Sequence, residues 1–546
     1  MNRRPLPLLL AAALAGLLAL AGAGSAAAVP LVQRTTYTTI EGTGSTWSEL
    51  IVQKWIADVD ANGMKVVYTG GGSSKGRKDF AQSTNDFAIS EIPYQGVDEN
   101  GNADKSDRPY AYLPIVAGGT AFTYQLKIGN ELVRNLRLSG ETIAKIFTNQ
   151  ITNWNDPAIA EDNNGRTFPS LAITPVVRSD GSGTTAQFTT WMDAQYPSIW
   201  RPYFGHSGLT SYYPRKSGSR TVAQAGSDQV MNTVKGFAGN GTIGYVEYSY
   251  PVNANYPVVK VLNKAGYFVE PTQYNTAVAL TKAKINPSTL TQELDGVYVN
   301  PDPRAYPISS YSYMVIPTSA TDARMTTAKR QTLADFVYYS LCAGQTSAGS
   351  YGYSPLPLNL VQAGFDQVAK LKKADPEVNL TDRDVRSCNN PTFDGTNLSH
   401  NVLADKAPQP AACDKVGAGP CGTETGTNKP STDDTGTPGA ADPDAPAAAD
   451  ADGGAGAGAD DAGSGPGVGA DGPAAEVDPE TGLPAADSAV PTDAAGAAVY
   501  ANPTLVSARP GDQRPFGVLA VLQLFALVLV PGLVVAVLHR RRGGRP

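Results

Sequence analysis

A glycine-rich turn between a predicted strand and a predicted helix is the feature that most restricts the fold of this chain. In "TPVVRSDGSGTTAQFTTWM", residues 174–192, β-branched residues precede the turn, and Phe188, Trp191 and Met192 follow it at intervals of three and four. The first pattern is typical of a short buried strand and the second of an amphipathic helix. Strand, turn and helix in this order indicate an α/β fold, in which ligands bind beyond the carboxyl ends of the strands.

Two further segments repeat this arrangement. "KVVYTGGGSSKG" contains a predicted strand over residues 65–69 that leads directly into a glycine turn, and "DFAISEIPY" is a short apolar strand that ends at Glu91. "EGTGSTWSELI" has glycines before a predicted helix in which Trp47, Ile51 and Trp55 recur at intervals of four. The chain therefore contains three glycine-rich turns at which a helix is predicted to begin.

These turns have the chemistry of an anion site. The start of a helix offers unpaired N–H groups and a positive dipole end, so a tetrahedral anion fits there. Arg178 adds a planar, permanently charged fork, and Asp180 can hold that fork in place. The residues that supply caps or a close backbone approach are Gly42, Gly44, Ser45, Thr46, Ser73, Ser74, Gly181, Ser182, Gly183, Thr184 and Thr185. Each turn alone is also explained by ordinary capping, whereas three together favour a binding site.

Both ends of the chain carry apolar segments. Arg3 and Arg4 precede an apolar run over residues 6–21 and then small residues, which predicts a signal peptide over residues 1–28. Residues 516–538 form an apolar run long enough to span a bilayer, and the basic residues 539–546 follow it. We expect a transmembrane helix with a cytoplasmic tail, which puts the rest of the chain outside the cell. A buried core helix is the alternative.

The segment before this run differs in composition from the rest. Residues 29–404 contain 32 acidic and 32 basic residues, whereas residues 430–508 contain fourteen acidic residues and no Lys or Arg, which accounts for the net charge of -7. Few large apolar side chains are present, so burial cannot offset the entropy of ordering this segment. We predict a disordered linker rich in Ala, Gly, Pro and Asp over residues 401–515. Some eighty such residues reach on the order of 50 Å, and a spacer is the simplest role.

The four cysteines lie in the part predicted to be extracellular, where disulfides persist. "CDKVGAGPC" forms a short closed loop, so we pair Cys413 with Cys421 and Cys342 with Cys388. The other two connectivities stay open. Metal binding is the weaker alternative, because no histidine lies at ligand spacing near these cysteines.

Seven motifs identify a resemblance to a known family. In chain order they are "GTGSTW", "GGGSSKG", "DFAISE", "ITNWNDPAI", "RSDGSGTT", "GTIGYVEY" and "YGYSPLP", between about residues 39 and 360. Together they closely resemble the extracytoplasmic phosphate-binding proteins of ATP-driven (ABC) phosphate importers. The resemblance implies a two-lobed α/β periplasmic-binding-protein fold of type II, with phosphate between lobes that close about a hinge.

The resemblance also implies domain boundaries. The phosphate-binding domain is expected over residues 29–400, with crossovers near residues 114–120 and 300–311. The expected lobe 1 comprises about residues 29–117 and 305–400, and lobe 2 about residues 118–304.

The family's ligand contacts map onto nine positions of this chain. They are Thr46, Trp47, Ser73, Glu91, Arg178, Asp180, Ser182, Gly183 and Thr184. Two of them depart from the family pattern. Glu91 stands where relatives usually have an aspartate, and Trp47 replaces a phenylalanine whose backbone N–H is the part that the family uses. We therefore ask whether Glu91 reaches the ligand or points to solvent.

The expected function is capture of inorganic phosphate outside the cell and delivery to the permease of a phosphate ABC transporter. The expected partners are phosphate, that permease and, through the carboxyl-terminal helix, the membrane. We expect a monomer that is not an enzyme and has no cofactor, metal or nucleic-acid partner.

Two alternatives remain. A surface phosphatase would use Ser182 as a nucleophile, but it needs a base, and the chain has only His206, His400 and His539. "DGSGT" also lacks the second glycine of a G-x-S-x-G elbow. A structural or adhesive surface protein would explain the linker and the anchor. It would have no need of the anion-site motifs.

Overall fold

The computed structural model describes residues 37–98, 101–381 and 383–429. The predicted signal peptide, the transmembrane helix at residues 516–538, the basic tail and the linker beyond residue 429 lie outside the described residues. Within the described part, no helix is both long and apolar enough to cross a membrane.

The α/β prediction is confirmed by a central eight-stranded sheet in the order β11-β10-β12-β6-β17-β3-β1-β2. Its strands are β1 (Ile40–Gly44), β2 (Val66–Gly70), β3 (Phe87–Ser90), β6 (Tyr110–Tyr124), β10 (Thr174–Arg178), β11 (Val222–Gln224), β12 (Thr242–Glu247) and β17 (Ser309–Pro317). β1 pairs in parallel with β2 and β3, and β10 pairs in parallel with β11 and β12. The carboxyl ends of these parallel strands therefore form the edges at which the glycine-rich turns begin.

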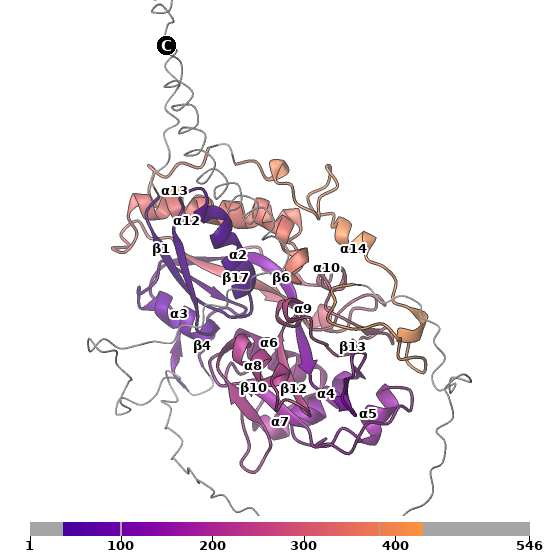
Figure 1. Cartoon of the computed structure of the whole chain (residues 1–546). Helices are drawn as coiled ribbons and strands as arrows, with labels where there is room; N and C mark the ends of the chain where they lie inside the picture. The colour runs from indigo at the N-terminus through magenta and orange to yellow at the C-terminus, as the bar shows by residue number, and fades with distance from the viewer. Residues whose placement is uncertain (1–36, 99–100, 382, 430–546) are drawn as a thin grey trace, which may run out of the picture. The chain divides into compact units, whose positions relative to one another are not determined.

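The long strand β6 joins two halves of this sheet (Figure 1). From Tyr110 to Gly119 it pairs antiparallel with β17, and from Thr120 to Tyr124 it pairs antiparallel with β12. We call the β2-β1-β3-β17 side the first half-sheet and the β12-β10-β11 side the second half-sheet. The change of partner lies between Gly119 and Thr120.

Smaller sheets lie outside the central one. A three-stranded sheet has the order β14-β13-β9, and three hairpins have two strands each. Their strands are β9 (Arg137–Leu138), β13 (Lys260–Leu262), β14 (Phe268–Val269), β4 (Gly96–Val97), β5 (Ala103–Asp104), β7 (Lys127–Ile128), β8 (Glu131–Leu132), β15 (Lys284–Ile285) and β16 (Gln292–Glu293). Val259 N donates to Phe122 O in β6, which attaches the segment before β13 to the second half-sheet.

Helices follow the strands as the turn chemistry predicts. They are α2 (Glu49–Asp60), α3 (Ser73–Ala81), α4 (Gly140–Phe147), α5 (Pro157–Asp162), α6 (Gly183–Gln195), α7 (Pro197–Phe204), α8 (Gly226–Lys235), α9 (Ser249–Ala254), α10 (Gln273–Leu280), α11 (Asp295–Tyr298), α12 (Thr327–Leu341), α13 (Leu358–Ala374) and α14 (Val402–Lys406), with short 3₁₀ turns η1 (Ala343–Ser347), η2 (Gly349–Tyr351), η3 (Val385–Ser387) and η4 (Ala412–Asp414). The Ser182 side chain accepts a hydrogen bond from Thr185 N and so caps α6. Trp55 and Ile51 of α2 are fully buried, as their spacing predicts.

The cysteine pairing is confirmed, with one disulfide joining Cys342 to Cys388 and another joining Cys413 to Cys421. The start of the predicted linker is wrong. Residues 401–429 include α14 and the second disulfide, and Asp414 pairs with Lys260 where both side chains are 3% exposed. Contacts with distant parts of the chain, which composition does not reveal, extend the folded part to residue 429.

Candidate functional site

Two of the glycine-rich turns meet in space. α3 follows β2 in the first half-sheet, and α6 follows β10 in the second. Gly183 N donates a hydrogen bond to Ser73 Oγ at 3.1 Å, and Ser74 N donates to Gly181 O at 3.0 Å. The first turns of two helices from opposite half-sheets are thus in direct contact, and both present N–H groups there.

Glu91 lies in this contact and does not point to solvent. It immediately follows β3 and is 0% exposed. Ser73 Oγ donates to its Oε2 at 2.6 Å, and Ser312 Oγ donates to its Oε1 at 2.9 Å. Burial raises the pKa of the Glu91 carboxyl, although these serine hydrogen bonds act in the opposite direction. The longer side chain is therefore folded inward between β17 and α3.

Arg178 forms a fork with Asp180. The Arg178 Nε donates to Asp180 Oδ1 at 2.7 Å, and Nη2 donates to Oδ2. Burial by itself would lower the pKa of Arg178, but the charge and hydrogen bonds of Asp180, together with nearby tyrosines, outweigh burial and raise this pKa. Burial by itself would raise the pKa of Asp180, yet the charge and hydrogen bonds of Arg178, together with a hydrogen bond from Gly226 N, hold that pKa below its usual value. The cation is therefore fixed in direction and charged at neutral pH.

The third glycine-rich turn, which contains Thr46, is linked to Arg178 through Ser227, a residue that was not predicted from the sequence. Ser227, in the first turn of α8, accepts a hydrogen bond from Arg178 Nη1 at 3.3 Å. Its backbone N donates to Thr46 Oγ1 at 3.2 Å, and the two hydroxyl oxygens are 3.0 Å apart. Tyr250 OH donates to Thr46 O. Thr46, from the first half-sheet, is thus held by two residues that follow strands of the second.

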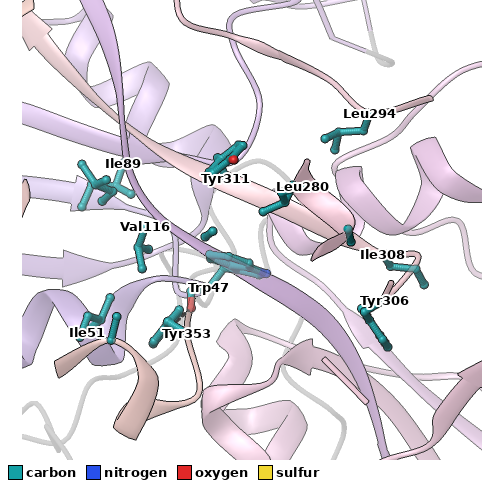
Figure 2. Close-up of a cluster of buried hydrophobic side chains, with 14 of the residues drawn as sticks. Trp47, Ile51, Ile89, Val116, Leu280, Leu294, Tyr306, Ile308, Tyr311 and Tyr353 are labelled. Atoms are coloured by element: carbon teal, nitrogen blue, oxygen red, sulfur yellow. Dashed lines mark hydrogen bonds between the residues drawn. The ribbon is translucent and has the colours of Figure 1, made fainter. Parts of the chain in front are cut away.

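Trp47 is buried in the adjoining apolar cluster (Figure 2). Its ring meets Tyr353 edge-on with centroids 5.8 Å apart, and Tyr353 OH donates to Trp47 O at 2.7 Å. Trp47 N donates to Ser45 Oγ at 2.9 Å. A Cβ added to Gly118 of β6 would lie 2.6 Å from the indole and 2.7 Å from Glu247 Oε1, so the indole packs directly on the strand that joins the half-sheets.

Thr184 and Trp47 each carry a buried polar atom with no hydrogen-bond partner among the described residues, namely Thr184 Oγ1 and Trp47 Nε1. Thr184 lies in the first turn of α6, next to Gly183. Leaving a buried donor unpaired is costly, so such atoms are exceptions that call for an explanation. An anion at the start of α6 would offer Thr184 Oγ1 an acceptor.

Eight of the nine predicted residues therefore fall into two contacting groups, and the ninth, Trp47, lies in the apolar cluster next to Thr46. Ser73, Glu91 and Gly183 form one, with Ser182 and Thr184 beside Gly183, and Thr46, Arg178 and Asp180 form the other through Ser227. Three residues of the site, Ser227, Ser312 and Tyr250, were not predicted from the sequence. Ser227 could have been predicted, because "GSDQV" resembles the other helix starts. Ser312 and Tyr250 stand in segments with no such signal.

Neither histidine in the described part of the chain contacts Ser182. The Ser182 Oγ accepts from Thr185 N in its role as a cap. His206 contacts Ser207 O, and His400 contacts Asp394 and Asp405 on the surface. The described residues also contain no group of three or more His, Cys, Asp or Glu that could hold a metal ion.

Two half-sheets joined by the long strand β6, with helix starts and a fixed arginine meeting between them, define a substrate-binding protein of the periplasmic type. A profile described as a PBP superfamily domain matches residues 32–343. The phosphate-binding protein PstS of Methanocaldococcus jannaschii is 30% identical over 344 residues, covering 61% of this chain and 86% of that protein. Its counterpart in Xylella fastidiosa is 29% identical over 335 residues, covering 61% and 85%.

The chain therefore belongs to the PBP superfamily and, within it, to the PstS phosphate-binding proteins. These relatives are named as binding proteins of phosphate and not as enzymes. A solved phosphate-binding protein from Stenotrophomonas maltophilia is 18% identical, with a TM-score of 0.44, 60% of this chain covered and 93% of that one. The family assignment rests on the profile and the sequence relatives.

Proposed function

We propose that this protein captures inorganic phosphate outside the cell and delivers it to the permease of an ABC phosphate importer. One observation carries the proposal: the first turns of α3 and α6 contact each other through Ser73 and Gly183, beside the fixed guanidinium of Arg178. Helix starts and an arginine together favour a tetrahedral anion. Because the chain belongs to the PstS phosphate-binding proteins, we infer that this anion is phosphate.

The nine predicted residues have different chemical roles in the proposed binding of phosphate. Backbone N–H groups of Trp47, Gly183 and Thr184, together with nearby hydroxyls, donate to phosphate oxygens. The hydroxyl donors are those of Thr46, Ser73, Ser182 and Thr184. Three of these donors have acceptors within the protein, since Trp47 N donates to Ser45 Oγ, Gly183 N to Ser73 Oγ and Ser73 Oγ to Glu91, so phosphate would replace those acceptors. Arg178 adds the permanent charge, and Asp180 keeps it aimed. Glu91 accepts a hydrogen bond from a protonated phosphate oxygen, which sulfate lacks near neutral pH.

We propose that the two half-sheets belong to lobes that open and close about the change of partner in β6. The lobes correspond to residues 29–117 with 305–400, and to residues 118–304. Thr46 and Ser73 come from one lobe, and Arg178 and Gly183 from the other. Phosphate that binds both groups would favour the closed arrangement by its differential affinity.

We further propose that residues 516–538 anchor the protein in the membrane, with the binding domain extracytoplasmic. The acidic segment before them then acts as a tether with a reach on the order of 50 Å. Such a length lets the receptor move between solution and the permease without leaving the cell surface.

Calorimetric titration of residues 29–429 with phosphate tests the proposal. We expect saturable 1:1 binding that Arg178→Ala abolishes or strongly weakens. Unchanged binding by Arg178→Ala would place the site elsewhere, and no binding by the parent would remove the proposed function. Turnover of a colorimetric phosphate ester by the same protein would instead support the phosphatase alternative.

A further inference from the structure

The segment from Cys388 to Lys429 provides a second connection between the two half-sheets, in addition to β6. We call it the strap. It begins on the side of the first half-sheet, where the disulfide fixes Cys388 to Cys342 at the end of α12. Asn390 Nδ2 and Thr392 Oγ1 both donate to Leu356 O, at 3.0 and 3.1 Å.

The middle of the strap meets the connection that leads back into β17. Arg304 Nη1 donates to Ala404 O at 3.0 Å and to Ala407 O at 3.2 Å. Pro408 and Gln409, which follow, are exposed. These two residues lie between the contacts with Arg304 and the ion pair of Asp414.

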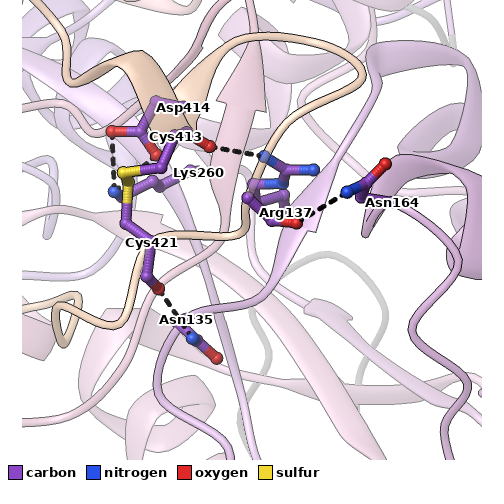
Figure 3. The surroundings of a disulfide bond; sticks show 8 residues. Asn135, Arg137, Asn164, Lys260, Cys413, Asp414 and Cys421 are labelled. Carbon is purple, nitrogen blue, oxygen red and sulfur yellow. Dashed lines mark hydrogen bonds and ion pairs between the residues drawn. A yellow bond between two sulfur atoms is a disulfide. The ribbon is translucent and has the colours of Figure 1, made fainter. Parts of the chain in front are cut away.

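The carboxyl-terminal part of the strap is fixed to β9 and β13, on the side of the second half-sheet (Figure 3). The Asp414 carboxylate accepts two hydrogen bonds from Lys260 Nζ, at 2.8 and 2.9 Å, and both side chains are 3% exposed. Arg137 Nη1 donates to Cys413 O at 3.0 Å, and Asn135 Nδ2 donates to Cys421 O at 2.8 Å. The second disulfide closes the loop that carries these contacts.

A further contact ties the strap to Val258, just before β13. Thr425 Oγ1 donates to Val258 O at 2.6 Å, and Val258 forms a bridge with Thr123 in the β12-paired part of β6. Beyond it, Asn428 Nδ2 donates back to Gly349 O at 2.8 Å. Each side of the change of partner in β6 is thus fastened to the same segment.

We propose that the strap limits how far the two lobes open. Opening would separate Leu356 of lobe 1 from Arg304 and Lys260 of lobe 2, so it would have to extend the stretch between Thr392 and Ala404 or break the contacts at its ends, among them a buried ion pair. Breaking such a pair by separating its partners is strongly unfavourable. The strap therefore lowers the population of widely opened forms and slows phosphate release. The release part rests on the proposed function, whereas the opening part does not.

The profile match ends at residue 343, so the strap lies beyond the part of the chain that defines the superfamily. The two disulfides mark the two attached parts of the strap, one on each side. This arrangement gives a purely structural alternative, in which the strap adds stability and has no effect on opening.

Lengthening the strap separates these two explanations. Eight Gly and Ser residues inserted between Ser399 and His400, ahead of the contacts with Arg304, add about 26 Å of extended chain without removing a contact named above between the strap and the two lobes. The matched control has the same insertion between Gly417 and Ala418, inside the loop that the disulfide closes, where it cannot lengthen the connection. Both variants carry Asn428→Gly, which removes the tie to Gly349, and glycine suits the φ of 59° there.

Small-angle X-ray scattering of both variants without phosphate is the deciding measurement. We expect a larger radius of gyration for the lengthened strap than for the control, and equal radii once phosphate is saturating. Stopped-flow measurements should then show release roughly fivefold faster or more for the lengthened strap. Equal radii without phosphate overturn the proposal, whatever the release rates. If neither variant binds phosphate, the proposed function fails while the scattering comparison still decides the role of the strap.

Discussion

Ser73 Oγ donates a hydrogen bond of 2.6 Å to Oε2 of Glu91, and the same Ser73 oxygen accepts from Gly183 N. One hydroxyl therefore links the start of α3, the end of β3 and the start of α6. Since the serine's only proton is given to the carboxylate, Glu91 determines which way this hydroxyl points. The carboxylate is thus a neighbour of the proposed anion and competes with it for the Ser73 proton.

Replacing Glu91 should change selectivity more than affinity. Glu91→Gln keeps the shape but removes the charge and adds a donor, so it should bind phosphate more weakly and admit sulfate. Loss of an unpaired or repelled contact can account for roughly 10⁴–10⁵ in discrimination. Glu91→Asp should stay selective. Phosphate titrations in the presence of sulfate provide the measurement, and a Glu91→Gln protein that rejects sulfate as firmly as the parent would contradict this assignment.

Arg178→Lys should weaken phosphate binding by about 1–3 kcal/mol. Lysine keeps the charge but cannot keep two donors on Asp180 and a third on Ser227, because its ammonium is a point charge. Calorimetry on the variant gives the loss. Arg201→Lys, an exposed arginine paired with Asp193, is the control and should bind as the parent does. An unaltered affinity in Arg178→Lys would mean that the guanidinium geometry has no part in binding.

The pH dependence of stability should follow Glu49 in part. Burial, with a contribution from the Asp228 charge, raises the pKa of Glu49 to about 7. The folded state then binds a proton more tightly than the unfolded state, so this contribution is complete below about pH 4.5 and is lost as the pH rises through about 7. The upper limit of the effect is about 3 kcal/mol.

Urea unfolding of the parent and Glu49→Gln at pH 5 and pH 8 measures this difference. The variant should show a smaller loss of stability over the interval. Glu131→Gln, at an exposed position, should follow the parent. An equal loss of stability between pH 5 and pH 8 in Glu49→Gln and the parent would show that a group other than Glu49 causes this pH dependence.

Gly118→Ala should destabilise the protein by about 1–3 kcal/mol, the usual cost of overpacking. The added methyl would lie 2.6 Å from the Trp47 ring and 2.7 Å from Glu247 Oε1. Adding Trp47→Phe removes the ring atoms that it meets and should recover part of the loss. Thermal unfolding of the two single variants and the double variant gives the coupling. Strictly additive losses would show that the indole does not pack against β6 as described.

Stopping the chain after Pro510 should release the protein into the medium. The folded part, including the strap, is intact in this product, so phosphate binding should equal that of the full chain. Fractionation followed by titration measures both properties. A product that stays in the membrane fraction after a high-salt wash would contradict the single-helix anchor.

Local chemistry was enough to predict the elements that carry the site. β10 and α6 lie where β-branched residues, a glycine turn and apolar residues at helical spacing predict them, and β2 and α3 follow the same pattern. Such patterns depend on residues within a few positions of each other, through strand alternation, helix periodicity and capping. The short loop between Cys413 and Cys421 is local in the same sense.

Contacts between distant residues were decided only by the tertiary structure. Ser73 meets Gly183 across 110 positions of the chain, and Lys260 meets Asp414 across 154. Nothing near Ser312 or Tyr250 marks them as neighbours of Glu91 and Thr46. Residues 401–429 of the strap were predicted as part of the linker. The order of the strap depends on a buried ion pair, two disulfides and long-range hydrogen bonds, which form only when the rest of the fold has brought their partners into place.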